Sequence, residues 1–400
     1  MPPPPGQGLP RVALIGVTGY GAIYLKLLRA ALRRREIALV AAVIINQEKV
    51  PAIVAELQAA GAAIYPTAAE FFIHQTGRVD LCLVPTGIQW HARLTIAALE
   101  AGMNVLVEKP LAGSAADADA IRSAELAANR WVAVGFQDIY TLEARWLKTQ
   151  LLAGVVGDIR EISMIGLWPR SRAYFDRTAW AGRAFADDAA VLDSPLNNAF
   201  AHFINLALYF AGDSPAESAA ATVESAELFR AHRIEMFDTA VVHARTPAGA
   251  RCWFGVSHAI DVTRQPEILI ECSAGRVEWW HEQRCVLQHH DGPRQVFPLP
   301  STEEARVLMF DAMLARLRDP SSPVCTTAIA EKHTRFIEDV QRAGAVREFP
   351  ASLIDWTPDA ESGSDIPVVR GLAEAFDRAF KTKTRLATVL ERDESALLSS

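Results

Sequence analysis

Residues 79–110, VDLCLVPTGIQWHARLTIAALEAGMNVLVEKP, decide the fold of this chain. Two short apolar runs, Leu81–Val84 and Asn104–Val107, enclose a segment whose apolar residues recur at helical spacing. Continuous apolar runs are typical of strands in a parallel sheet, because helices cover both faces of such a sheet. The stretch therefore predicts a strand–helix–strand unit within an α/β fold.

Each of these two strands ends at a group of residues that do not belong in a core. Pro85, Thr86, Gly87, Trp90 and His91 follow the first strand, and Glu108, Lys109 and Pro110 follow the second. In open α/β sheets, ligands bind just beyond the carboxyl ends of the strands, so both groups are candidate ligand-binding residues. Pro110 also disfavours a helical conformation at Lys109, which predicts that the lysine leaves its strand in an extended conformation.

A glycine-rich turn near the N-terminus is the third candidate. The apolar run Arg11–Ile15 predicts a strand, and a helical pattern follows the turn. Between them stands GVTGYG, which supplies Gly16, Thr18, Gly19, Tyr20 and Gly21. A strand, a glycine turn and a helix form the arrangement in which backbone N–H groups hold a pyrophosphate. Thr18 occupies the second glycine position of the usual motif, and we expect Gly19 and Gly21 to compensate.

Together these motifs resemble the Gfo/Idh/MocA family, the glucose–fructose oxidoreductase and inositol dehydrogenase group of NAD(P)-dependent oxidoreductases. The Glu-Lys-Pro strand end is a weak signal alone, but it is specific when Pro-Thr-x-x-x-x-His and the glycine turn precede it. The resemblance covers residues 1–210 closely, the following region loosely and residues 361–400 hardly at all. It implies an N-terminal Rossmann domain and a C-terminal α+β domain.

The expected fold class is therefore α/β, with a doubly wound parallel sheet followed by a large open, mainly antiparallel sheet. Residues 1–10 are a Pro-rich leader that we expect to be disordered, without the apolar core of a signal peptide. Six strands alternating with helices make 11–136 the NAD(P)-binding domain. Short turns between consecutive strands make 137–360 the α+β domain, for substrate binding and oligomerisation, and 361–400 is expected to be a helical tail.

The choice between NAD and NADP stays open in the sequence. The second predicted strand, Ile37–Ile45, ends at Asn46. An acidic residue here selects NAD through the ribose hydroxyls, whereas a cation favours the 2′-phosphate of NADP. Asn46 is neutral, and the charges of Glu48 and Lys49 oppose one another. We also assign Gln137, directly after the last Rossmann strand, to the cofactor site.

A polar stripe interrupts a strongly apolar helical pattern at Asn197–Phe210. Asn198, His202 and Asn205 are spaced at i, i+4 and i+7, which places them on one face. Buried polar groups are costly unless they are hydrogen-bonded or line a cavity, so His202 is either a satisfied core residue or part of a site. The resemblance favours a site, because family dehydrogenases carry Asp-x-x-x-His-x-x-Asp here. Both acids are amides in this chain, and Asp193 is a candidate replacement.

The region around this helix supplies the remaining candidates. Trp180 and Arg183 resemble the family element that packs beside the nicotinamide and its phosphate. Tyr140, Arg170 and Tyr174 suit the aromatic, basic rim of a site for a hydroxylated or carboxylated substrate. The alternative for the loop residues is a solvated segment with ordinary charges.

These residues can be given chemical roles. Oxidation of a secondary alcohol needs a base that accepts the hydroxyl proton and a cation that stabilises the developing alkoxide. His202 is the expected base, since an ordinary imidazole titrates near neutrality, and Lys109 is the expected cation. Asn198 is expected to orient His202. We expect a structural role for Glu108, and either helix capping or cofactor-side packing for His91.

Three functions remain open at this point. We favour an NAD(P)-dependent dehydrogenase acting on a sugar, a cyclitol or a sugar-acid derivative. The second function is a redox-assisted lyase or glycosidase, in which the bound cofactor is regenerated. The third is a cofactor-binding sensor without chemistry, and the presence of both Lys109 and His202 argues against it.

Composition agrees with an enzyme and excludes other classes. A net charge of −7 over 400 residues argues against a nucleic acid or an anionic membrane as partner. The five cysteines are scattered, which predicts no zinc or other metal site, no disulfide framework and a reduced cytoplasmic protein. No run is long enough to span a bilayer. Trp253, Trp279 and Trp280 suit either a core or a subunit interface, and we expect a homodimer or homotetramer.

Overall fold

The computed structural model describes residues 8–390, and the chain divides into two compact units. Unit 1 comprises the chain up to Tyr140 together with Glu303–Glu331. Unit 2 comprises Thr141–Thr302 and the chain from Lys332 onward. Most of the expected leader, and the last ten residues of the expected tail, lie outside the described residues.

Unit 1 contains a six-stranded parallel sheet, as the sequence predicts. Its strand order is β3-β2-β1-β4-β5-β6. The strands are β1 (Arg11–Ile15), β2 (Ala38–Val43), β3 (Ala63–Tyr65), β4 (Leu81–Val84), β5 (Asn104–Val107) and β6 (Val132–Val134). The order reverses between β1 and β4, which is where a doubly wound sheet binds its ligand.

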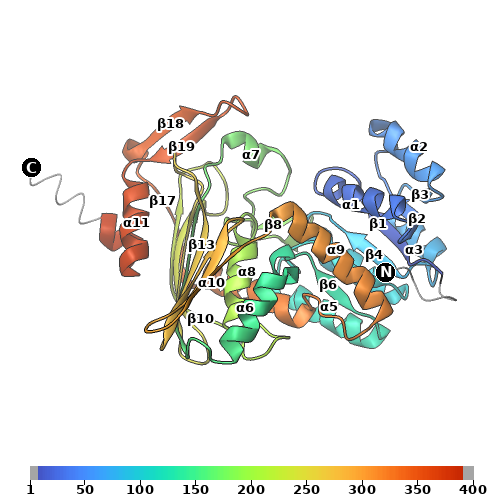
Figure 1. Ribbon diagram of the computed structural model, residues 1–400. Coiled ribbons are helices and arrows are strands. Elements are labelled where there is room, and N and C mark those ends of the chain that lie inside the picture. Colours follow the sequence, from blue (N-terminus) through green and yellow to red (C-terminus); the bar gives the residue numbers. More distant parts are fainter. Residues whose placement is uncertain (1–7, 391–400) are drawn as a thin grey trace, which may run out of the picture. The chain divides into compact units, whose positions relative to one another are not determined.

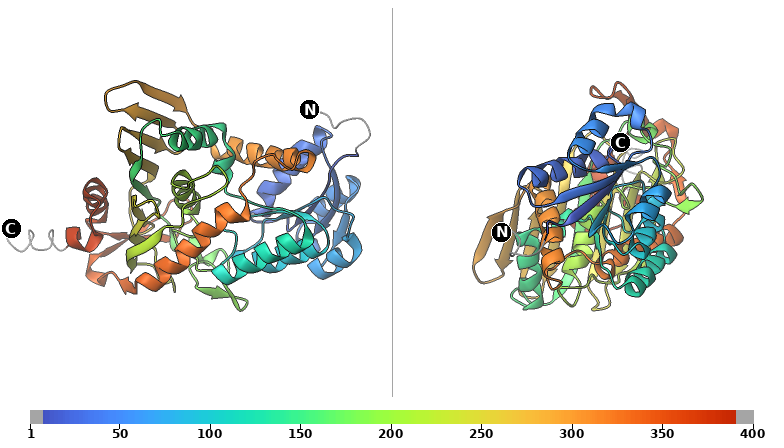
Figure 2. Two further views of the ribbon diagram at one scale, coloured as in Figure 1. Left: turned by 90° about the horizontal axis from the view of Figure 1, so that it is seen from below. Right: turned by 90° about the vertical axis from the view of Figure 1, so that its right-hand side faces the viewer.

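Helices cover both faces of this sheet. They are α1 (Gly21–Arg33), α2 (Pro51–Ala59), α3 (Ala68–Gln75), α4 (Ile88–Glu100) and α5 (Ala115–Ala128), with short 3₁₀ turns η1 (Gln47–Lys49) and η2 (Gln137–Tyr140). In the right-hand view of Figure 2, α1 (dark blue) lies on one side of the strands, and α4 and α5 (teal) lie on the other. The sequence analysis missed α3, which begins after Thr67, whose hydroxyl accepts the backbone N–H of Glu70.

Helix α9 (Thr302–Arg318) belongs to unit 1, although the sequence analysis placed these residues in the second domain. Arg306 donates a 3.1 Å hydrogen bond to the Tyr20 hydroxyl of α1. Lys26, also on α1, forms an ion pair with Glu303. The chain after α9 then runs beside β6, where the Val134 N–H donates to the Cys325 carbonyl at 2.8 Å. The first unit is therefore built from two separate stretches of sequence.

Unit 2 contains a nine-stranded, mainly antiparallel sheet in the order β16-β15-β14-β13-β7-β12-β11-β10-β17, with parallel pairs only at β7–β12 and β10–β17 among the described residues. The strands are β7 (Ile159–Leu167), β10 (Thr222–Arg230), β11 (Thr239–Arg245), β12 (Arg251–Ser257), β13 (Arg264–Cys272), β14 (Gly275–Trp280), β15 (Arg284–His289), β16 (Arg294–Pro298) and β17 (Val346–Glu348). The expected open antiparallel sheet is confirmed.

Helices and hairpins complete unit 2. They are α6 (Leu142–Leu152), α7 (Arg172–Asp176), the hairpin β8 (Phe185–Ala186) and β9 (Ala189–Ala190), α8 (Ala201–Phe210), the 3₁₀ turn η3 (Ala351–Leu353), the hairpin β18 (Ile354–Pro358) and β19 (Asp365–Val369), and α11 (Leu372–Thr382). Helix α10 (Thr327–Ala343) begins in unit 1 and belongs to unit 2 from Lys332 onward. Figure 1 shows α6 and α8 on one side of the large sheet and α11 on the other.

Helix α11 covers part of the outer face of this sheet with the chain's own residues. Trp253 of β12 is 1% exposed and its ring centroid lies 5.6 Å from that of Phe380. Its indole N–H donates to the Thr384 carbonyl at 3.1 Å. Trp279 is also buried, against Phe210 of α8. Of the two environments left open by the sequence, these two tryptophans therefore have a core environment.

The structure also bears on the cysteines, on membrane-spanning helices and on metal sites. All five cysteines are free and buried. Within residues 8–390, no helix combines the length and the apolar character needed to cross a membrane, and no group of His, Cys, Asp and Glu side chains is arranged to hold a metal ion.

Candidate active site

The turn between β1 and α1 has the backbone that its glycines predict. Gly16 and Gly19 have φ angles of +89° and +57°, and a Cβ at either position would meet nothing within 4 Å. A Cβ on Gly21 would instead collide with the carbonyl oxygen of Gly16. The first turn of α1 carries no acidic residue, and its N-cap residue Tyr20 makes no side-chain capping bond. An open turn before an uncapped, uncharged helix start fits a bound pyrophosphate.

A cavity of about 450 Å³ opens beside this turn. It is lined by residues that follow β1, β2, β3 and β4, among them Gly16, Thr18, Asn46, Lys49, Thr67, Thr86 and Trp90. The hydroxyl oxygen of Thr86 is buried and has no hydrogen-bond partner among the described residues. Buried polar atoms are normally paired, so an unpaired hydroxyl on a cavity wall indicates a place for a ligand's polar group. Pro85, also assigned to the cofactor site, is buried beside the glycine turn.

His91 joins the two strand-end turns of the Val79–Pro110 stretch. The ring is fully buried on α4, with Nδ1 at 2.7 Å from the Pro110 carbonyl oxygen and Nε2 at 3.1 Å from that of Thr86. Burial lowers the pKa of His91 to about 4, although the two carbonyl contacts act in the opposite direction. The ring is therefore neutral near pH 7 and donates to one carbonyl only. The ring thus links the turn after β4 to the turn after β5, while the two roles expected for it stay predictions.

The Glu108 carboxyl is turned into unit 1. Its side chain accepts a 2.7 Å hydrogen bond from the Tyr24 hydroxyl of α1. A Cβ on Gly135 would lie 2.5 Å from the same carboxyl oxygen, so the glycine leaves room for it. Burial raises the pKa of Glu108 to about 7, against the lowering effect of the Lys109 charge and the Tyr24 bond. Glu108 thus links β5 to α1, which agrees with the structural role expected for it.

Lys109, the expected cation, follows β5 and is half-buried; its peptide bond to Pro110 is cis. Gln137 is buried in η2, and its amide donates to Asp138 at 3.3 Å. Tyr140 is 2% exposed, and its hydroxyl donates to the Val134 carbonyl at 2.9 Å. That bond lies within unit 1, and the assignment of Tyr140 to substrate binding stays a prediction.

Asn198 lies in the turn before α8, which corrects the expectation that it shares a helix face with His202. The helix begins at Ala201, because the Phe200 N–H donates to the Pro195 carbonyl, five residues back, at 2.8 Å. Asn198 and His202 are therefore not neighbours on one face of a helix.

Asp193 and Asn198 are joined directly. The Asn198 side-chain amide donates to Asp193 Oδ1 at 2.8 Å, and the Gly182 N–H donates to Asp193 Oδ2 at 2.6 Å. Asp193 is 2% exposed. It therefore connects the segment that carries Trp180 and Arg183 to the turn before α8. Asp193 is thus hydrogen-bonded to the residue at the position of the first family acid, and its replacement of that acid stays a prediction.

His202 and Asn205 are buried on α8, 8% and 0% exposed. Neither the oxygen nor the nitrogen of the Asn205 amide has a hydrogen-bond partner among the described residues. Leaving a buried amide unpaired costs roughly 1–3 kcal/mol, so such a group is expected where a ligand can satisfy it. The polar stripe on α8 is thus reduced to His202 and Asn205.

Three of the predicted aromatic and basic residues of unit 2, Arg170, Tyr174 and Trp180, form a cluster with Arg177. The Arg170 guanidinium lies over the Tyr174 ring, 4.9 Å from its centroid. The Arg177 guanidinium lies 3.6 Å from the Tyr174 ring centroid and 5.7 Å from that of Trp180. Burial raises the pKa of Tyr174, and the charge of Asp193 raises it further, while the arginines lower it. Stacked guanidinium groups of this kind present donors to carboxylates and hydroxyls.

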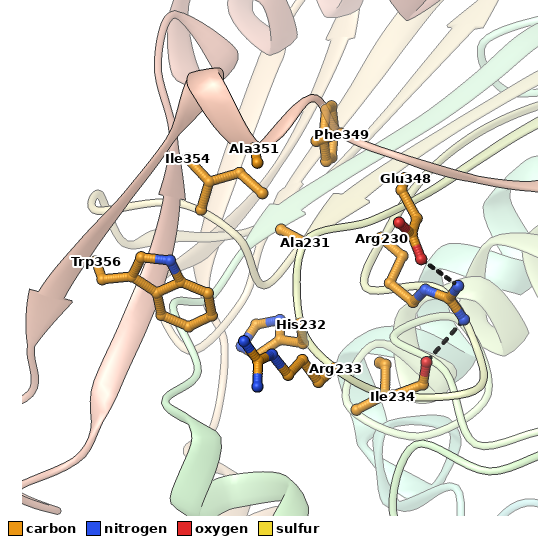
Figure 3. A pocket seen from close by; sticks show the side chains of 10 residues that line it. All are labelled: Arg230, Ala231, His232, Arg233, Ile234, Glu348, Phe349, Ala351, Ile354 and Trp356. Atoms are coloured by element: carbon orange, nitrogen blue, oxygen red, sulfur yellow. Dashed lines mark hydrogen bonds and ion pairs between the residues drawn. The ribbon is translucent and has the colours of Figure 1, made fainter.

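A second cavity, of about 430 Å³, lies in unit 2 and contains none of the predicted residues (Figure 3). Arg230 donates to Glu348 Oε1 at 2.8 Å and to the Ile234 carbonyl at 2.7 Å, so its guanidinium braces the loop after β10. Trp356 lines the opposite wall. These residues come from separated segments and share no motif, so no local signal in the sequence identifies this cavity. Thr67 of the unit 1 cavity was not predicted either, although it follows a predicted strand, whereas Trp90 belongs to the predicted strand-end group.

Comparison with known proteins agrees with this geometry. Residues 11–136 match the Gfo/Idh/MocA family described as "Oxidoreductase family, NAD-binding Rossmann fold", and residues 144–278 match the "GFO/IDH/MocA C-terminal domain". The chain is 29% identical to the inositol 2-dehydrogenase of Azotobacter vinelandii over 298 residues, which is 73% of this chain and 75% of the relative.

Solved structures show the same fold. An inositol dehydrogenase homolog from Azotobacter vinelandii, complexed with NADH and myo-inositol, has a TM-score of 0.70 at 20% identity, covering 84% of this chain and 97% of that one. The WlbA dehydrogenase from Bordetella pertussis, in complex with NADH and UDP-GlcNAcA, has a TM-score of 0.69 at 19% identity, covering 91% and 99%. The 3-ketoreductase KijD10 from Actinomadura kijaniata, with NADP and TDP-benzene, has a TM-score of 0.67 at 16% identity, covering 86% and 100%.

Proposed function

Because the chain belongs to the Gfo/Idh/MocA oxidoreductase family, we propose that it oxidises or reduces a secondary hydroxyl carbon of a sugar, a cyclitol or a sugar-acid derivative. The family membership makes it an NAD(P)-dependent oxidoreductase acting on CH–OH groups. The substrate class is supported by the arginine–aromatic cluster at Arg170, Tyr174 and Trp180, whose donors and ring faces suit a polyhydroxylated or carboxylated molecule.

The observation that carries the proposal is the glycine turn at Gly16–Gly21 beside the unit 1 cavity. Backbone N–H groups of the turn, at the positive end of the α1 dipole, would hold the pyrophosphate of a dinucleotide. Thr18 and Thr86 would donate to its polar groups, and Asn46 would meet its adenosine ribose. When bound, the nicotinamide ring supplies the hydride acceptor or donor.

The chain's own residues move the proton. In the oxidation direction, His202 accepts the proton of the substrate hydroxyl, and the Lys109 ammonium stabilises the developing negative charge on oxygen. The bond between Asn198 and Asp193 positions the turn that leads into α8, so Asn198 acts as a positioning residue. The unpaired amide of Asn205 is available to a second hydroxyl of the substrate.

The test is a titration of the full chain with NAD, NADP and their reduced forms, followed by a screen of polyols, sugars and sugar acids for change in the absorbance of the reduced nicotinamide. Binding of a dinucleotide together with turnover of at least one such substrate is expected. A protein that binds none of the four dinucleotides would refute the proposal.

One observation favours a second function. Both acids that flank the family histidine are amides here, Asn198 and Asn205, which weakens the electrostatic support for a base. A redox-assisted lyase or glycosidase on the same scaffold would regenerate its bound dinucleotide in each cycle. Product formation without net change in the oxidation state of the dinucleotide would identify this function, whereas stoichiometric reduction identifies a dehydrogenase.

We also infer that the large sheet of unit 2 pairs with a second copy through strands β13–β15. Trp253 and Trp279 are inside the chain's own core, which leaves Trp280. Trp280 is half-buried beneath the Arg284 guanidinium, 4.1 Å from its ring centroid, and Leu269 on β13 is also half-buried. Light scattering that gives a monomer mass at micromolar concentration would exclude this assembly. The five free cysteines are those expected in a reducing compartment such as the cytoplasm.

A further inference from the structure

The unit 1 cavity is electrostatically biased toward a phosphate. Among the described residues that line it, Lys49 is the one charged side chain, and no carboxylate is present. Glu48, whose negative charge opposes that of Lys49 in the sequence, does not line the cavity. We infer that this cavity recognises the 2′-phosphate of NADP through Lys49, so that the protein binds NADP in preference to NAD. The inference rests on the proposed dinucleotide binding at this site.

Lys49 stands where a dinucleotide fold recognises the adenosine ribose. Strand β2 runs beside β1, and the Gly16 N–H donates to the Val43 carbonyl at 3.0 Å, so the glycine turn lies at the end of β2. Asn46 follows this end, and η1 brings Lys49 one turn further, with its N–H donating to the Asn46 carbonyl at 3.1 Å. Residues after the second strand read the ribose in this fold. Both Asn46 and Lys49 line the cavity and are exposed.

The chemistry of the two cofactors differs at this ribose. NAD presents two hydroxyls, which an acidic side chain accepts together, and Asn46 provides only one neutral oxygen acceptor. NADP presents a phosphate that carries nearly two negative charges at neutral pH. The start of α3 at Pro66, Thr67 and Ala68 also lines the cavity and adds the positive end of a helix dipole. Glu70 in the first turn of α3 opposes this field, but it does not line the cavity.

The experiment is a direct binding titration of the full chain with NADP and with NAD, by calorimetry or quenching of intrinsic fluorescence. NADP should bind at least about tenfold more tightly at low ionic strength, the scale of one charge-assisted hydrogen bond. The ratio of the two affinities should shrink as salt is added, because an exposed ammonium is screened. It should also shrink below about pH 6, where the phosphate gains a proton.

Variants separate recognition of the phosphate from general binding. Lys49→Ala should weaken NADP binding by about tenfold and leave NAD binding nearly unchanged. Asn46→Asp should weaken NADP and strengthen NAD, since the carboxylate repels the phosphate and accepts the ribose hydroxyls. Arg78→Ala is the matched control: it removes an exposed cation from the same unit that does not line the cavity, and it should change neither affinity.

Each outcome decides a different question. Tighter binding of NAD than NADP would overturn the inference and leave the proposed oxidoreductase function intact. An equal loss of both affinities in Lys49→Ala would also overturn it, because the lysine would then not read the phosphate. Binding of neither dinucleotide would refute the proposed function itself.

Discussion

Replacing Glu108 with glutamine should remove a pH dependence of stability from unit 1. The Glu108 carboxyl is 4% exposed, and burial raises its pKa from the ordinary 4.5 to about 7. Below the ordinary pKa, both the folded and the unfolded chain hold the proton and the group imposes no penalty. Between pH 4.5 and about 7, the unfolded chain has released this proton while the folded chain still holds it. The free energy of unfolding therefore falls as the pH rises through this range.

The size of this effect follows from the two pKa values. A difference between 4.5 and about 7 corresponds to about 3 kcal/mol of lost stability by about pH 8. About 1 kcal/mol of this is lost between about pH 6 and about pH 8. Glutamine keeps an oxygen that accepts the 2.7 Å bond from the Tyr24 hydroxyl but has no proton to release. The variant should therefore be more stable than the native protein at about pH 8, by about 2–3 kcal/mol.

The assay must report on unit 1 alone. Cys82 and Cys325 are fully buried in unit 1, whereas the other three cysteines belong to unit 2. Thiol labelling at increasing urea, read by mass spectrometry of each cysteine peptide, gives separate unfolding midpoints for the two units. Tyr24→Phe is the matched control, since loss of the donor should raise the pKa of Glu108 and steepen the pH dependence. An unchanged pH dependence of the Cys82 midpoint in Glu108→Gln would show that the reasoning is wrong.

The remaining predictions concern the site and the core. Lys109→Ala and His202→Ala should each lower turnover by about a hundredfold or more, while dinucleotide binding is retained. Near-normal steady-state turnover in His202→Ala would mean that another residue is the base. Gly21→Ala should abolish dinucleotide binding in a titration, because its Cβ collides with the Gly16 carbonyl, and unchanged affinity would count against the turn as the pyrophosphate site. Phe376→Ala on α11 should destabilise unit 2 by about 3–5 kcal/mol, since its ring is fully buried; labelling of Cys252 should report the loss, and an unshifted midpoint would contradict the packing of α11 on the sheet.

The sequence by itself determined the parallel sheet of unit 1, the glycine turn and the strand-end positions of Thr86 and Lys109. These features depend on signals that are local in the chain. Apolar runs of strand length lie between helical patterns, and the turn needs residues that adopt positive φ, as Gly16 and Gly19 do. The carboxyl ends of parallel strands share one edge, so locating the strands also located the candidate ligand-binding residues.

Only the tertiary structure decided the partners of these elements. Helix α9 contacts Tyr20 and Lys26, which lie more than 270 residues away along the chain. Asn198 lies outside the expected helix because the Phe200 N–H donates to the Pro195 carbonyl, five residues back, which interrupts the helical pattern. Trp253 is equally suited to an interface or a core by sequence, and Phe380 decides for the core. The periodicity of the sequence specifies which face of a helix or strand is apolar. The surface that covers this face is set by packing between distant parts of the chain, which local patterns do not specify.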